Sequence, residues 1–258
     1  MRGPAGVLAL VLAETLAGGA ALLFLTPLWR EVRHGFFKLT GSVLAVLGLA
    51  CWGSVGAARL PGSTPGDQAW WLAVGVTAAT GVWSVLMFAR AERAGRVLGY
   101  LTVPGSLALL GALAGTAGHD HVFAFLELLA GAAFIGAVLD GLLLGHWYLT
   151  DRRLTRTPIN RTTTLLLAAV VLEAAAVIGR GFGPASPSLE LSPLLAASGV
   201  GSFVAVGMVA TTALIAVFIR LVLAGTRATA VQAATGFYYL AVITAFTAEL
   251  AAKIRFLP

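Results

Sequence analysis

The chain has 258 residues, of which 59% are hydrophobic and only 11% are charged, and its formal net charge is +6. This composition excludes an ordinary soluble domain and is typical of a protein that crosses a membrane several times. In such a protein a positive balance reflects topology and contact with anionic lipid, and no basic patch suggests nucleic-acid binding.

Eight apolar stretches are long enough to cross the hydrocarbon core of a bilayer, which is about 30 Å thick. The sequence therefore predicts an all-α, multi-pass protein of the cell membrane with about eight helices. The first stretch follows Arg2 as a signal peptide would, but it is longer than a signal peptide's apolar run, so we expect a retained helix. The stretches are Ala5 to Leu28, Phe36 to Ala58, Ala69 to Ala89, Ala94 to Ala114, Val122 to Leu149, Thr162 to Ile178, Leu194 to Leu223 and Ala228 to Ala251.

A proline lies inside the fourth of these stretches. Pro104, followed by Gly105, removes a backbone donor, and its ring clashes with the preceding turn. We expect an interruption of the fourth helix there, with backbone carbonyls left free.

Lysine and arginine are divided unequally between the two sets of loops. Counted along the eight predicted helices, 12 of the 17 fall on one side. Because positive flanks resist translocation, that side is predicted to be cytoplasmic, and both termini are predicted to lie outside. The twelve are Arg30, Arg33, Lys38, Arg90, Arg93, Arg96, Arg152, Arg153, Arg156, Arg161, Arg220 and Arg227.

The two halves of the chain share a motif. Glu-x-Leu-Ala-Gly-x-Ala begins at Glu14 and again at Glu127, in the first helix of each group of four. We predict that residues 1–116 and 117–258 are two copies of one four-helix unit, related by a pseudo-two-fold axis along the membrane normal. A chance match is the alternative in a chain this rich in alanine, glycine and leucine.

Four glutamates lie inside four different apolar stretches, although burying an acidic side chain there costs on the order of 3 kcal/mol. Following each helix in its predicted direction places all four in the outer half of the membrane, so we expect a polar site between helices. The alternative is that each is a structural charge, paired within its own helix or close to the interface; Glu249 and Lys253 form an i,i+4 pair. The candidate ligand-binding residues are Glu14, Glu127, Glu173, Arg180, Glu249, Lys253, His119 and His121.

The histidines have weaker patterns. His119 and His121 flank Asp120 in an outer loop. They either lie in a solvated loop or act as a proton relay at the outer polar site. Two histidines at this spacing are only a weak indication of a metal site. Asp140 is costly because it lies deep in the inner half of the fifth helix, whereas His146 on the same helix is typical of an interfacial end.

Haem and iron-sulfur clusters are not expected in this chain. Bis-histidine haem needs histidines at matched depth on facing helices, whereas His34 and His146 are near the inner surface and the other two are in an outer loop. Cys51 is the single cysteine, which excludes thiolate-held clusters or zinc in this chain on its own.

The end of the chain carries a resemblance. Residues 248–256, Ala-Glu-Leu-Ala-Ala-Lys-Ile-Arg-Phe, resemble the Glu-x-x-Gly-Arg-x-x-Phe closing stretch of the membrane anchors of DMSO-reductase-type enzymes, with Ala252 and Lys253 in place of its Gly and Arg. Two four-helix halves, no haem ligands and an outer polar pocket also look like that family and the related NrfD/polysulfide-reductase anchors. The resemblance implies electron exchange between quinone and an iron-sulfur partner protein.

These observations predict an integral-membrane subunit of a respiratory electron-transfer complex. It would anchor an iron-sulfur or cytochrome partner and bind a quinone near the outer leaflet, where Glu14, Glu127, Glu249 and Lys253 could supply donors and a proton route. Two alternatives stay open: a proton-coupled secondary transporter or channel with a midplane site, and a purely structural anchor.

Overall fold

The computed structural model describes residues 1–258 except 61, 152, 183–198, 226, 228 and 257–258. The described residues form helices and no strands, and eight of the helices are long and apolar enough to span a membrane, which confirms the all-α multi-pass prediction. They are α1 (Gly3–Leu25), α3 (His34–Ala58), α4 (Thr64–Phe88), α5 (Glu92–Ala114), α6 (His121–Thr150), α7 (Thr157–Gly179), α9 (Val200–Ala224) and α10 (Ala230–Lys253). The predicted starts of the last two stretches, 194–198 and 228, lie outside the described residues.

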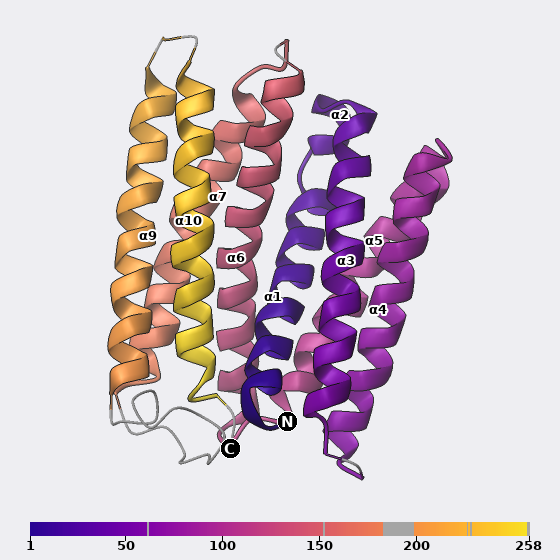
Figure 1. The fold of residues 1–258 in the computed structure, drawn as a ribbon, viewed down its shortest axis with the longest axis vertical. Helices are drawn as coiled ribbons and strands as arrows, with labels where there is room; N and C mark the ends of the chain where they lie inside the picture. The colour runs from indigo at the N-terminus through magenta and orange to yellow at the C-terminus, as the bar shows by residue number, and fades with distance from the viewer. Residues whose placement is uncertain (61, 152, 183–198, 226, 228, 257–258) are drawn as a thin grey trace.

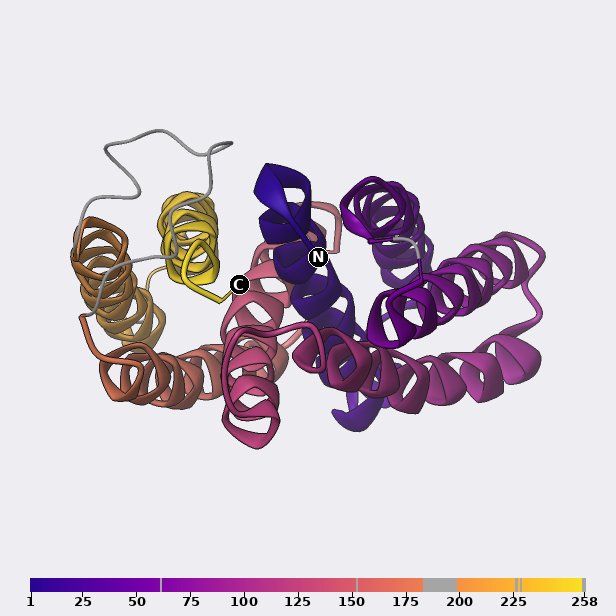
Figure 2. The ribbon, with the colours of Figure 1, turned by 90° about the horizontal axis from the view of Figure 1, so that it is seen from below.

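The long helices run side by side along the long axis, and both termini lie at the same end (Figure 1). We call this end the outer end, following the charge-based prediction, and the opposite end the inner end. Figure 2 shows α1 and α6 packed together at the centre, with α3, α4 and α5 on one side and α7, α9 and α10 on the other.

Burial separates the two central helices from the rest. Almost every side of α1 and most of α6 is buried. The helices at the periphery of the bundle, by contrast, expose large apolar side chains, among them Leu49, Val85, Val171 and Leu221. Exposed apolar faces are what a bilayer requires, because lipid provides no partner for polar groups. The molecule is therefore built around the α1–α6 pair.

Small residues allow α1 and α6 to approach closely. A Cβ on Gly18 of α1 would collide with the Ala132 carbonyl, and one on Gly136 of α6 would collide with the Gly18 backbone. Backbone contact of this kind is a main source of helix association in lipid, where the hydrophobic effect does not drive packing. Both glycines lie within or just after the repeated Glu-x-Leu-Ala-Gly-x-Ala motif.

The expected interruption at Pro104 is wrong, because α5 continues through it from Glu92 to Ala114. Hydroxyl groups around the proline bond to helix carbonyls: Thr102 Oγ1 donates to the Gly99 carbonyl at 2.6 Å and Ser106 Oγ to the Thr102 carbonyl at 2.8 Å. These bonds go to carbonyls other than that of Tyr100, which is the one that loses its donor at Pro104. The four-residue helix α2 (Leu28–Glu31) was not predicted.

Ion pairs at the inner end join the two sides of the molecule. Arg161 of α7 makes two bonds to the Glu31 carboxylate of α2, at 2.7 and 3.0 Å. Arg33 lies 3.2 Å from Asp151, the residue that follows α6. Ion pairs thus hold the two sides together at the inner end, and close backbone packing of α1 against α6 holds them together in the middle.

Candidate functional site

Lys253, near the outer end of α10, lies between two buried carboxylates. Its Nζ is 2.8 Å from Oε1 of Glu14 on α1 and 2.9 Å from Oε2 of Glu249, one turn earlier on α10. Both glutamates are fully buried and Lys253 is 3% exposed. Since a buried charge without a partner is very costly, the lysine is what makes two carboxylates tolerable here.

Gly131 of α6 makes room for this group. A Cβ at Gly131 would stand 2.5 Å from Oε1 of Glu14 and 2.9 Å from Oε2 of Glu249. The repeated motif therefore has two roles at this point: it brings α1 against α6, and its glycine leaves the space that the carboxylates fill.

A second ionic group lies beside the first. Oε2 of Glu127 on α6 is 2.9 Å from Nε2 of His119 and 3.2 Å from Nη1 of Arg180, the residue that ends α7. Burial, and then the nearby Arg180 charge, lower the pKa of His119, although Glu127 acts in the opposite direction. Burial likewise lowers the pKa of Arg180. At neutral pH His119 is therefore a neutral partner of Glu127, and Arg180 carries the balancing charge.

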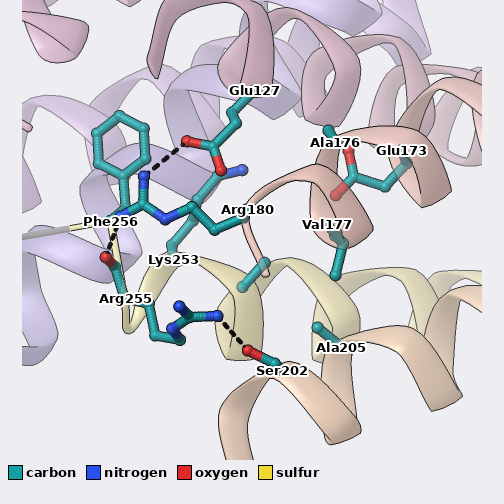
Figure 3. A pocket seen from close by; sticks show the side chains of 11 residues that line it. Glu127, Glu173, Ala176, Val177, Arg180, Ser202, Ala205, Lys253, Arg255 and Phe256 are labelled. Atoms are coloured by element: carbon teal, nitrogen blue, oxygen red, sulfur yellow. Dashed lines mark hydrogen bonds and ion pairs between the residues drawn. The ribbon is translucent and has the colours of Figure 1, made fainter. Parts of the chain in front are cut away.

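The residues just after α10 cover this second group (Figure 3). Arg180 donates to the Arg255 carbonyl, and Arg255 in turn donates to the Gly181 carbonyl and to Ser202 at the start of α9. The His119 ring packs edge-on against Phe256, with 5.2 Å between ring centroids. The C-terminal turn thus closes the site on its outer side.

Glu173 of α7 lines a small cavity between these groups (Figure 3). It is 1% exposed, and its Oε2 has no hydrogen-bond partner among the described residues. The cavity has about 20 Å³ of space for water centres, room for about one water molecule. Its other polar lining comes from Glu127, Arg180, Ser202, Lys253 and Arg255.

An apolar groove of about 390 Å³ lies on the lipid side of the same helices, between α6 and α7. Its walls are Phe123, Leu126, Leu129, Ala130, Leu172, Ala175 and Ala176, and its polar side chain is that of Glu127. Leu126 and Leu172 are each 55% exposed, so the groove faces the region where lipid would lie. Glu127 and Ala176 line both the groove and the small cavity, which places the two back to back.

The structure brings together seven of the eight candidate residues, which we call the outer cluster: Glu14, His119, Glu127, Glu173, Arg180, Glu249 and Lys253. His121 is exposed at the first position of α6, apart from them. The ion pairs mostly join different helices: Arg180 binds Glu127 rather than Glu173, and Lys253 binds Glu14 as well as Glu249.

Sequence reasoning missed three residues that close the site: Ser202, Arg255 and Phe256. Arg255 and Phe256 lie within the closing stretch that carries the family resemblance, which is the signal that could have found them. Ser202 has no such signal, because its role depends on how the start of α9 packs against the end of α10.

The remaining titratable candidates lie toward the inner end. His34 bonds the Met87 carbonyl at 2.7 Å and the Glu92 carboxylate at 3.0 Å, and His146 Nδ1 is 3.4 Å from the Tyr239 hydroxyl. Asp140 is 1% exposed. Within the described ranges, no group of three or more His, Cys, Asp or Glu is arranged to hold a metal ion.

Comparison with known proteins gives no further assignment. No family model, no curated protein and no solved structure matches the chain.

Proposed function

We propose that the chain is an integral-membrane subunit of an electron-transfer complex in which a quinone docks in the α6–α7 groove against Glu127. The observation that carries the proposal is the back-to-back arrangement of an apolar, lipid-facing groove and a charged, water-sized cavity, with the Glu127 carboxylate between them.

A quinone needs an apolar slot, a polar contact for its carbonyl and a route for protons. The groove has a volume within the range of small-molecule sites, whereas the small cavity lined by Glu173 is too small for a ring. The ring would therefore lie in the groove, with one oxygen toward Glu127 and the tail in the lipid beyond Leu126 and Leu172.

Protons and electrons leave a quinol by different routes in this proposal. Oxidation of a quinol to a quinone releases two protons and two electrons. Glu127 accepts the two protons one after the other and passes each to His119 or to the carboxylates around Lys253, which lie next to it in the outer cluster. The electrons go to a partner protein that carries an iron-sulfur cluster or a haem, bound at the outer end; reduction runs the same steps backwards.

Quinol oxidation by the native complex, with a soluble short-chain quinol and an artificial electron acceptor, tests the proposal. Glu127→Gln removes the proton acceptor and should lower turnover by about 100-fold, the order found for general bases. Ala175→Trp fills the groove from an exposed position and should raise the KM for quinol by about tenfold or more.

A matched control is available in the first half of the chain. Ala108 is also exposed and lines a comparable groove between α4 and α5, next to Trp71 and Gly111. Ala108→Trp should leave the KM for quinol unchanged. If Ala175→Trp and Glu127→Gln both oxidise quinol like the unmodified complex, the α6–α7 groove is not the quinone site.

A further inference from the structure

Asp140 lies in the inner half of α6 and has no polar partner among the described residues. It is 1% exposed, and neither carboxylate oxygen has a hydrogen-bond partner among the described residues. Its Oδ1 lies 4.0 Å from where a Cβ on Gly19 of α1 would stand, so the carboxyl group faces α1. The outer cluster does not include it, and the proposed quinone chemistry does not use it.

The groups packed around Asp140 carry no charge. On α1 Asp140 faces Gly19, which Leu44 of α3 also approaches, and on α10 the Tyr238 ring lies against Gly141, the next residue of α6. In the part of the chain that the structure describes, no cation from any of these helices or from α7 is within ion-pair distance. A carboxyl group in such surroundings is stable only with its proton bound.

Three buried hydroxyl groups lie between the level of Asp140 and the inner end. The Tyr238 hydroxyl is 3.0 Å from Thr163 Oγ1 of α7, and both residues are fully buried. One turn further inward on α10, buried Thr235 lies against Gly145 of α6. Thr163 and Thr235 also donate to the Ile159 and Val231 carbonyls of their own helices, so each hydroxyl of this row has to rotate to pass a proton inward.

The row ends at an open pocket on the inner side. This pocket, of about 430 Å³, is lined by Tyr148, Arg156, Thr229, Val231 and Gln232, among others, and Val231 is one turn before Thr235. Toward the outer end, by contrast, the backbone contact of Gly18 with Ala132 and Gly136 lies between Asp140 and the outer cluster. Asp140 and the outer cluster therefore lie on opposite sides of a close backbone contact between α1 and α6.

We propose that Asp140 is a second proton-binding site, filled from the inner side through Thr235, Tyr238 and Thr163 and separated from the outer cluster by the α1–α6 crossing. One proton from the inner solution combines with the carboxylate to give the carboxylic acid, and it leaves by the same row. The inference does not depend on the quinone proposal, because proton binding at Asp140 needs neither quinone nor partner.

Infrared spectroscopy of the full chain in oriented proteoliposomes tests this directly. The chain is labelled with carboxyl-¹³C aspartate. Because Asp67, Asp120 and Asp151 are at helix ends, the labelled band from inside the membrane belongs to Asp140. The labelled band should be that of a carboxylic acid at neutral pH. It should convert to carboxylate when the inner solution is made alkaline, and it should not respond to the outer pH. Asp140→Asn should remove it.

Tyr238→Phe tests the route, because it keeps the ring against Gly141 and removes the hydroxyl. Hydrogen–deuterium exchange of the Asp140 carboxyl from the inner side should slow by about tenfold, the order expected for losing one hydrogen-bonded link. Thr212→Val is the matched control, since Thr212 forms a similar hydroxyl pair with Thr244 at 2.7 Å between α9 and α10. It should leave the exchange rate unchanged.

The isotope label keeps the test independent of whether Asp140→Asn folds. A carboxylate band at neutral pH, a carboxylic-acid band that ignores the inner pH, or one that follows the outer pH would each overturn the proposal. Equal exchange rates in the Tyr238→Phe and unmodified chains would overturn the route.

Discussion

At the residue scale, Lys253 has the greatest expected effect on stability. Lys253→Met leaves Glu14 and Glu249 buried beside each other without their cation, and breaking a buried pair in this way costs about 3–5 kcal/mol. We expect a loss of that size in the free energy of unfolding, measured by denaturant titration in mixed micelles.

A compensating variant separates charge from packing at the same place. Glu14→Gln and Glu249→Gln, combined with Lys253→Met, remove all three charges, and much of the lost stability should return because no unpaired charge remains. If Lys253→Met alone is as stable as the unmodified chain, the ion pairs do not hold α1 against α10.

His119 gives a pH dependence with a definite sign. Because burial lowers its pKa below the ordinary value of 6.5, the folded chain resists protonation more than the unfolded chain does. The stability that neutral His119 contributes is present above pH 6.5 and is lost as the pH falls below it.

His121 supplies the control for this measurement, since it is exposed two residues away. His119→Gln should flatten the dependence of the unfolding free energy on pH between about one unit above and one unit below 6.5, and His121→Gln should not. Equal pH profiles for His119→Gln and the unmodified chain would exclude a role for this ring in acid sensitivity.

At the scale of the helices, the α1–α6 crossing should tolerate no added side chain. Gly136→Ala puts a methyl group within 3 Å of the Gly18 backbone of α1, and overpacking of this kind costs about 1–3 kcal/mol. Gly111→Ala on α5 is the control, because no atom lies within 4 Å of its Cβ position. It should be neutral or stabilising by about 0.5–1 kcal/mol, from the helix preference of alanine. Thermal unfolding of the two variants compares them, and equal stability would show that the crossing can relax.

The helices themselves were largely predictable, because a membrane fixes their length and their apolar composition. The stretch Phe36 to Ala58 corresponds to α3 (His34–Ala58), and Val122 to Leu149 to α6 (His121–Thr150). The sequence misled at Pro104, because a membrane helix can continue through a proline that would end a helix in water. Helix α2 is too short for any periodicity to appear.

The site was predictable in its members and less so in its pairings. Glutamates inside apolar stretches stand out by their cost, and all four lie at the outer cluster. Which cation each one meets depends on helix packing: Glu127 and Arg180 are 53 positions apart in the chain. Intrahelical spacing predicted the Glu249–Lys253 pair and gave no sign that Glu14 completes it.

At the scale of the whole molecule, the two halves have the same order of neighbours. Within each half the first helix packs against the second and the fourth, and the third packs against both the second and the fourth. The contacts between halves follow the same rule, since α5 packs against α6 as α10 packs against α1. The duplication of residues 1–116 in 117–258 stays a prediction, and this order of contacts is what a pseudo-two-fold axis between α1 and α6 requires.

The orientation of the molecule in the membrane is the prediction on which the words inner and outer depend. Of the 16 lysines and arginines that the structure describes, 11 lie toward the end opposite the termini, so this end should face the cytoplasm. Single cysteines at Thr64 and Thr155 test this, because both positions are exposed and lie at opposite ends, one at the start of α4 and one between α6 and α7. Cys51 is fully buried and should give no background. In intact cells a membrane-impermeant maleimide should label the Thr64→Cys chain at once and the Thr155→Cys chain only after the membrane is opened. The reverse labelling pattern would mean the opposite orientation in the membrane. The outer cluster would then lie at the cytoplasmic surface, and the Asp140 pathway would open to the opposite surface.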